Sequence, residues 1–342
     1  MKRLAIPETG NLARGASARS PRRWVGPIAV LLVSALIATA CGGDDAATTT
    51  AAPTTTGTGG GLPVVYTGAD GVESTITDTG RIVTLSGEFT EIVFALGLGG
   101  NVVGVDLSSV YPEEAADLPK VGVERLLLAE PIIAQNPTVV LGDVDATPVE
   151  VIDQVRQTGI PVVIFPRYEG VDAPATKIRE VARVLGIPET GEELAASVQE
   201  EIDAVVAATA SVEERPPAAV VYLANRGSTI LMLGDNTVME GLLEAAGAID
   251  VAPAAGADGM MPLTPEALAG GAPDYIITTD RGIDATGGLE GFLEIPGVGE
   301  TPAAAAGNIL VFEDLYLLGL GPRTGQLLRD LATAFHPDLT IP

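Results

Sequence analysis

The sequence predicts an α/β fold with two Rossmann-like lobes, whose sheets are rich in parallel strands and which are joined by a rigid interlobe helix. Short apolar strands alternate with helices along residues 63–342, which is typical of parallel sheets covered on both faces. One helix-then-strand signature occurs at 127–141 and again, 136 positions later, at 263–277. A helical stretch at 173–210 separates the two copies, so we expect each copy in its own lobe.

The first 41 residues have the pattern of a targeting sequence. Arg22 and Arg23 precede a mostly apolar run, Val25–Ala40, that is too short to predict a membrane span. Small residues then lead to Cys41, a pattern similar to bacterial lipoprotein signals, in which this cysteine is lipidated and becomes the N-terminus. We therefore predict an exported chain, lipid-anchored to the outer face of the cytoplasmic membrane. An ordinary secretory signal is the alternative, and export by the Sec or the twin-arginine route is left open.

The predicted organisation has five parts, and length alone favours about two domains. They are a signal peptide at 1–40, a disordered tether at 41–62, an N-terminal lobe at 63–172, a helical connector at 173–210 and a C-terminal lobe at 211–342. The tether consists mainly of Ala, Thr and Gly, and such a segment cannot bury apolar surface.

Composition excludes several functions. The chain has 19 Lys and Arg against 45 Asp and Glu, a net charge of −26, so nucleic acid is a poor partner. Cys41 is the only cysteine and His336 the only histidine, which argues against disulfides, thiolate clusters, Ser-His-Asp catalysis and zinc sites built on imidazoles. No P-loop or dinucleotide-binding glycine motif is present. We expect no enzymatic activity.

The N-terminal lobe is predicted to begin with a hairpin and to continue with a parallel sheet. The hairpin strands are expected at Val64–Thr67 and Val72–Thr77. The sheet strands are expected at Arg81–Leu85, Val102–Val105, Val139–Leu141 and Val162–Phe165. Helices are expected at Thr90–Leu96, Ala129–Gln135 and Pro148–Thr158, because their apolar residues recur at helical spacing.

The connector and the C-terminal lobe continue the alternation. Connector helices are expected at Pro174–Leu185 and Glu192–Ala210, where apolar residues form a stripe. Later strands are expected at Ala219–Leu223, near Asp250, at Tyr275–Thr278 and at Ile309–Phe312, with a helix at Val238–Ala246.

The repeated signature places one glutamate at the same point of each lobe. Glu130 follows Leu127 by three positions, as Glu266 follows Leu263, and a proline follows each glutamate by seven. The helix dipole favours a glutamate in the first turn by roughly 0.3–1 kcal/mol, which explains one such residue better than two in register. Two matched acids indicate docking on a symmetric partner.

Four side chains follow predicted strands and are therefore candidates for ligand binding. Ligands of parallel α/β sheets bind at the carboxyl ends of the strands. Tyr111 lies in the loop after one predicted strand, while Arg226 and Arg281 follow two strands of the second lobe and Arg125 follows Val121–Val123. On pattern alone, each arginine is equally explained by a surface ion pair, and Tyr111 by ring packing within its loop.

Together these segments resemble the substrate-binding lipoproteins of bacterial ABC importers that take up ferric siderophores, cobalamin and haem. Within this class the strongest likeness is to haemin-binding proteins. The resemblance rests on Arg81–Leu85, Thr90–Gly97, Val103–Asp106, Tyr111-Pro112, Leu118–Gly122 and Gly319–Arg323. It implies a monomer that holds haem in the cleft between its lobes and delivers it to a permease homodimer with its ATPase. The alternative is the same fold carrying a ferric siderophore or cobalamin.

The resemblance also implies roles for single residues. Tyr111 would ligate the haem iron as a phenolate, a hard ligand suited to Fe(III), with Arg281 supporting it. Met260 and Met261 would line the cleft, and Arg125 and Arg226 would contact the ligand. Some relatives add a second axial ligand from the other lobe, where this chain has Ala224, so one protein ligand is expected. Glu130 and Glu266 would engage arginines on the two permease subunits.

Overall fold

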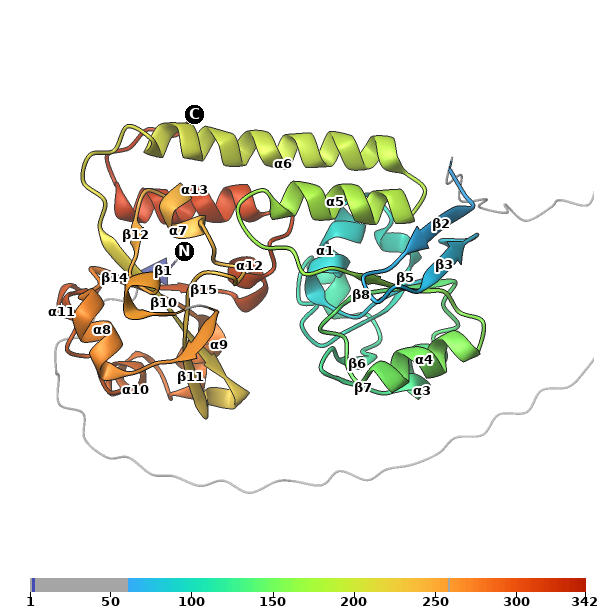
Figure 1. Cartoon of the computed structure of the whole chain (residues 1–342), viewed down its shortest axis with the longest axis horizontal. Coiled ribbons are helices and arrows are strands. Elements are labelled where there is room, and N and C mark those ends of the chain that lie inside the picture. The colour runs from blue at the N-terminus through green and yellow to red at the C-terminus, as the bar shows by residue number, and fades with distance from the viewer. Residues whose placement is uncertain (1, 4–60, 258) are drawn as a thin grey trace, which may run out of the picture. The chain divides into compact units, whose positions relative to one another are not determined.

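The computed structural model describes residues 2–3, 61–257 and 259–342 (Figure 1). The predicted lipidation site Cys41, almost all of the predicted signal peptide and most of the predicted tether lie outside these residues. Strand β1 (Lys2–Arg3) pairs antiparallel with β15 (Ile309–Phe312). The described ranges contain no helix that is both long enough and apolar enough to cross a membrane.

The N-terminal sheet is parallel throughout, as predicted. Its four strands have the order β5-β4-β8-β9, and every neighbouring pair is parallel. The strands are β4 (Ile82–Thr84), β5 (Val102–Val105), β8 (Val139–Asp143) and β9 (Val162–Phe165). Their helices are α1 (Gly87–Ala95), α2 (Glu113–Ala116), α3 (Ala129–Ile133) and α4 (Val149–Gln157), with the 3-10 turn η1 (Gly99–Asn101). Two hairpins flank the sheet, β2 (Val64–Thr67) with β3 (Glu73–Ile76) and β6 (Gly122–Val123) with β7 (Leu126–Leu127).

The C-terminal sheet is mixed. Its order is β1-β15-β14-β10-β11-β13, with β12 also paired to β10. The parallel part consists of β10 (Pro217–Ala224), β12 (Ile249–Asp250), β14 (Tyr275–Thr279) and β15. Strands β11 (Thr229–Leu233) and β13 (Met260–Pro262) add antiparallel to one edge and were not predicted. The helices are α7 (Leu242–Ala245), α8 (Pro265–Gly271), α9 (Asp280–Ala285), α10 (Leu289–Leu293), α11 (Pro302–Ala306), α12 (Asp314–Leu318) and α13 (Thr324–Phe335), with 3-10 turns η2 (Asn225–Gly227) and η3 (Pro253–Ala255).

The repeated signature folds into the same unit twice. Helix α3 begins at Ala129 and α8 at Pro265, and strands β8 and β14 begin at Val139 and Tyr275. Each of these pairs keeps the 136-residue spacing of the sequence. The chain therefore has two alike α/β lobes, as the repeat predicts.

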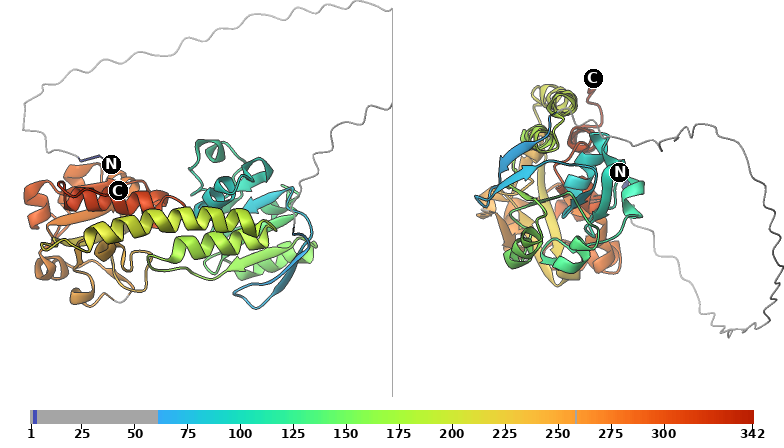
Figure 2. Two further views of the ribbon diagram at one scale, coloured as in Figure 1. Left: turned by 90° about the horizontal axis from the view of Figure 1, so that it is seen from above. Right: turned by 90° about the vertical axis from the view of Figure 1, so that its right-hand side faces the viewer.

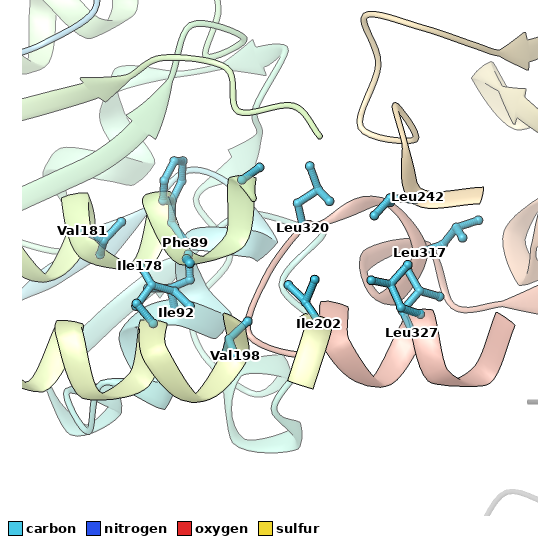
Figure 3. Packing of buried hydrophobic residues seen from close by; sticks show 14 of the residues in the cluster. Phe89, Ile92, Ile178, Val181, Val198, Ile202, Leu242, Leu317, Leu320 and Leu327 are labelled. Atoms are coloured by element: carbon cyan, nitrogen blue, oxygen red, sulfur yellow. The ribbon is translucent and has the colours of Figure 1, made fainter. Parts of the chain in front are cut away.

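Two long helices connect the sheets. Helix α5 (Ala173–Val184) packs along α6 (Pro188–Thr209), and α6 also packs against α13 (Figures 1 and 2). Buried apolar side chains of these helices, among them Ile178, Val198, Ile202 and Leu327, belong to one continuous core cluster that reaches both sheets (Figure 3). Separate clusters fill the opposite face of each sheet. The predicted helical connector is therefore a packed part of the core.

Candidate ligand cleft

A cavity of about 410 Å³ lies where the strands of both lobes end. Ser86 and Asp106 follow β4 and β5 in the first lobe, while Arg281 and Glu313 follow β14 and β15 in the second. Because parallel strands end at one edge of their sheet, the two carboxyl edges supply this lining together. The position of the cavity agrees with the loops that the sequence indicated.

The predicted site residues do not all reach this cavity. Arg125, Met260 and Arg281 line it. Met261 packs against the second lobe's core, and Arg226 is exposed in η2 with a positive φ of 57°. Tyr111 is 44% exposed and, in the described part of the chain, is also outside the lining.

The guanidinium beside Tyr111 belongs to Arg323, a residue that no sequence pattern indicated as a site residue. Arg323 Cζ lies 3.8 Å from the centroid of the Tyr111 ring. Arg281, which the resemblance assigned to this tyrosine, has its Nε 3.4 Å from Asp314 Oδ2 at the start of α12. Arg281 therefore lines the cavity and does not contact the Tyr111 ring through a cation–π interaction, as Arg323 does.

Half-buried acids form part of the cavity wall. Lys177, with its side chain 2% exposed, donates to Glu88 Oε2 at 2.7 Å and to the Gly319 carbonyl at 3.0 Å. Burial is the main reason that the pKa of Glu124 rises to about 10, and neighbouring Asp143 and Glu88 add to the effect. Burial also raises the pKa of Glu88 and of Asp143. Glu124 is therefore protonated at neutral pH and can act as a hydrogen-bond donor.

Partly exposed guanidinium groups also line the cavity. Arg125 Nη2 and Arg167 Nη2 lie 3.0 and 2.5 Å from the two carboxylate oxygens of Asp145. With Arg281, these residues give the cavity three accessible cations. Arg167 was missed, although it lies two residues after β9 and the same strand-end rule indicates it. Lys177 lies within α5 and no sequence signal indicated it.

Comparison with known proteins identifies the family. A model of the periplasmic binding protein family matches residues 82–315. The chain belongs to this family. It is 26% identical over 320 residues to an uncharacterised ABC transporter substrate-binding lipoprotein, YvrC of Bacillus subtilis (strain 168), a match that covers 93% of this chain and 98% of the relative.

Solved structures and a further relative show what similar binding proteins carry. The periplasmic haem-binding protein RhuT from Roseiflexus sp. RS-1, in its apo form, is 44% identical, with a TM-score of 0.73 over 76% of this chain and 99% of that chain. A vitamin B12-binding protein of Vibrio campbellii (strain ATCC BAA-1116) is 29% identical over 144 residues, 42% of this chain and 51% of the relative. Members of the family are substrate-binding transport proteins, so this binding protein has a substrate-binding role with an ABC transporter, which implies a permease and an ATPase.

Exposed apolar side chains lie at the binding protein's cavity, in addition to the three arginines. In the β6–β7 hairpin Val123 pairs directly with Leu126, so both side chains lie on one face, and Val123 lines the cavity. Val123 is 42% and Leu126 74% exposed, and Met260 of the other lobe is 53% exposed. Exposed apolar side chains beside a cavity mark a surface for an apolar ligand or partner.

The repeated glutamates of the binding protein lie away from the cavity. Glu130 and Glu266 are each the second residue of their helix, α3 and α8, and both are exposed. Neither is among the residues that line the cavity. Both are therefore accessible to a partner.

Proposed function

We propose that this binding protein captures haem in the cleft and delivers it to the permease of an ABC importer. Lipid on Cys41 would hold it to the outer face of the cytoplasmic membrane, and loss of membrane association in a Cys41→Ser chain tests that part. The transported haem is a ligand, and no catalytic cofactor is involved.

The observation that carries the proposal is Tyr111, which lies beyond the carboxyl end of β5 and is partly exposed beside a guanidinium. A phenolate is an established axial ligand of ferric haem. Iron supplies most of the free energy needed to ionise a phenol, whose ordinary pKa is about 10, at neutral pH. We therefore assign Tyr111 as the iron ligand in this proposal.

The surroundings fit the two chemistries of haem. Val123, Leu126 and Met260 offer apolar surface for the porphyrin faces. Arg125, Arg167 and Arg281 offer guanidinium forks, which match carboxylates such as the propionates. The 44% identity to RhuT supports the same ligand.

A second candidate is a corrinoid or ferric siderophore in the same cleft. The likeness to vitamin B12-binding proteins favours it, although that likeness spans about half of the relative. Half-buried acids that can donate hydrogen bonds, such as Glu124, would suit the many amides of a corrinoid.

The test is a titration of the purified protein with ferric haem, cyanocobalamin and ferric siderophores. We expect saturable haem binding with the charge-transfer band of a high-spin ferric phenolate. Tyr111→Phe should remove that band and weaken haem binding about tenfold or more, because iron–phenolate coordination is lost. Tyr275→Phe, which loses only a hydroxyl bond to the Ala334 carbonyl, is the matched control and should retain the band. Saturable cobalamin or siderophore binding without haem binding would overturn the proposal.

A further inference from the structure

Arg323 lies between two tyrosines, one from each lobe. Its Cζ is 3.8 Å from the ring centroid of Tyr111 and 4.9 Å from that of Tyr316. A guanidinium stacks on aromatic faces through its charge and its planar shape. Tyr316 is itself fixed, since its hydroxyl bonds Asp330 Oδ2 at 3.1 Å. Tyr111 therefore packs on a cation that also contacts a second, hydrogen-bonded tyrosine.

The plane of this guanidinium is fixed by a forked ion pair that crosses between the lobes. Arg323 Nε and Nη2 lie 2.9 and 2.7 Å from the two carboxylate oxygens of Glu91. Glu91 comes from α1 of the first lobe and is 4% exposed, whereas Arg323 precedes α13 of the second. Bidentate pairs of this kind define orientation as well as distance. The fork therefore holds the guanidinium against Tyr111 in one orientation.

A second tie holds the same loop. Lys177 of α5 donates to the carbonyl of Gly319, four residues before Arg323, and to Glu88 of α1. The segment that carries Arg323 is thus bonded at two points, to α5 before the buried Leu320 and to α1 after it. The Arg323 guanidinium therefore takes part both in the contact with Tyr111 and in the ion pair between the lobes.

We propose that Arg323 is the residue that positions Tyr111 for ligand binding, and that Glu91 fixes Arg323 for this task. The inference rests on the proposed function of Tyr111 as the metal ligand. It assigns Arg281 differently from the family resemblance. Arg281 lines the cavity beside Asp314 and is left to contact the ligand's anionic groups.

A double-mutant cycle with haem tests the coupling. Arg323→Lys keeps the charge but loses the fork and the planar stack, so we expect about tenfold weaker haem binding and a shifted phenolate charge-transfer band. In the Tyr111→Phe background Arg323→Lys should have no further effect, whereas general damage to the fold would weaken binding in both backgrounds. Glu91→Gln should shift the band in the same direction by a smaller amount.

The controls separate this role from others. Arg179→Lys removes a comparable bidentate pair, with Glu192, at an exposed place on α5 and should leave the band unchanged. If Arg281→Lys shifts the band and Arg323→Lys does not, the inference is wrong and the assignment from the resemblance holds.

A second measurement needs no ligand, so it stands even if haem does not bind. The measurement is NMR of the protein labelled with ¹³C-tyrosine, in which the Tyr111 ring signals are assigned by their loss in Tyr111→Phe. The chemical shifts of these signals should change in Arg323→Lys and remain unchanged in Arg179→Lys. If haem does not bind but the Tyr111 chemical shifts change in Arg323→Lys, the proposed function is wrong and the positioning of Tyr111 by Arg323 still holds. Unmoved ring signals of Tyr111 overturn the positioning itself.

Discussion

At the scale of single residues, the cleft combines accessible cations with acids that burial keeps protonated. Asp145 is shared by Arg125 and Arg167, so its charge cannot neutralise both. Glu124 carries no charge at neutral pH, because burial raises its pKa to about 10. The acidic wall therefore repels an anionic ligand less than its residue types imply.

The raised pKa of Glu124 predicts how stability depends on pH. Folded Glu124 keeps a proton that the unfolded chain releases above its ordinary value of 4.5, and holds it up to about 10. The folded state thus binds more protons within this window, so the free energy of unfolding falls as pH rises through it. Glu124→Gln resembles the protonated acid at every pH and should flatten this decline.

Thermal unfolding of the wild type and the variant between pH 5 and 9 measures the effect. Glu150→Gln alters an exposed first-turn glutamate of α4 and should leave the wild-type slope unchanged. Equal slopes for the wild type and Glu124→Gln would show that Glu124 is ionised in the folded protein.

A position after a strand end predicted some lining residues and not others. Of the four residues indicated in this way, Arg125 and Arg281 line the cavity, whereas Tyr111 and Arg226 do not. Arg323 was not assigned, because its partner Glu91 is 232 positions away and belongs to the other lobe. Sequence patterns report local periodicity, and side-chain pairs across lobes leave no such trace.

At the scale of elements, the repeated unit was predicted and the added edge strands were not. The signature has strong apolar periodicity and keeps its spacing in α3, α8, β8 and β14. The helix predicted at Val238–Ala246 is confined to Leu242–Ala245, because Gly241 adopts a φ of 71°. Strands β11 and β13 pair through long-range contacts that a local pattern does not contain.

Helix α6 should hold the two lobes in one cooperative unit. Ile202 is fully buried in the cluster that reaches both sheets (Figure 3). Ile202→Ala should cost about 2–5 kcal/mol, the usual loss for a buried aliphatic side chain, and lower Tm by roughly 4–10 °C. Calorimetry should still record a single transition. Val206→Ala, at a position 38% exposed on the same helix, should change stability by about 0.5 kcal/mol at most. Two separate transitions would mean that the lobes unfold independently.

At the scale of the whole molecule, the two lobes are alike at their exposed helix starts and unlike in the side chains near the cavity. The two lobes repeat one unit, which places Glu130 and Glu266 at equivalent exposed helix starts. The lobes also supply unlike groups: Tyr111 of the first lobe lies beside Arg323 of the second, and Arg281 of the second lobe lines the cavity. Under the proposed function, a ligand with one iron is contacted by unlike groups of the two lobes, and a permease of two like subunits is contacted by like ones.

This division predicts that docking and ligand binding can be separated. Glu130→Ala combined with Glu266→Ala should abolish most haem-dependent growth of a strain that relies on this protein, because charge pairing fixes orientation on the permease. Haem affinity should stay within about twofold, since neither residue lines the cavity. Stability should fall by only about 0.3–1 kcal/mol for each lost helix-dipole interaction.

Matched controls come from glutamates in the same structural setting but outside the repeat. Glu150 in the first turn of α4 and Glu290 in the first turn of α10 are exposed like Glu130 and Glu266. Glu150→Ala with Glu290→Ala removes the same charge from each lobe, so growth should persist if position rather than net charge directs docking. Equal loss of growth in both double variants would point to long-range attraction alone. A parallel fall in haem affinity for Glu130→Ala with Glu266→Ala would instead place these glutamates in the ligand site.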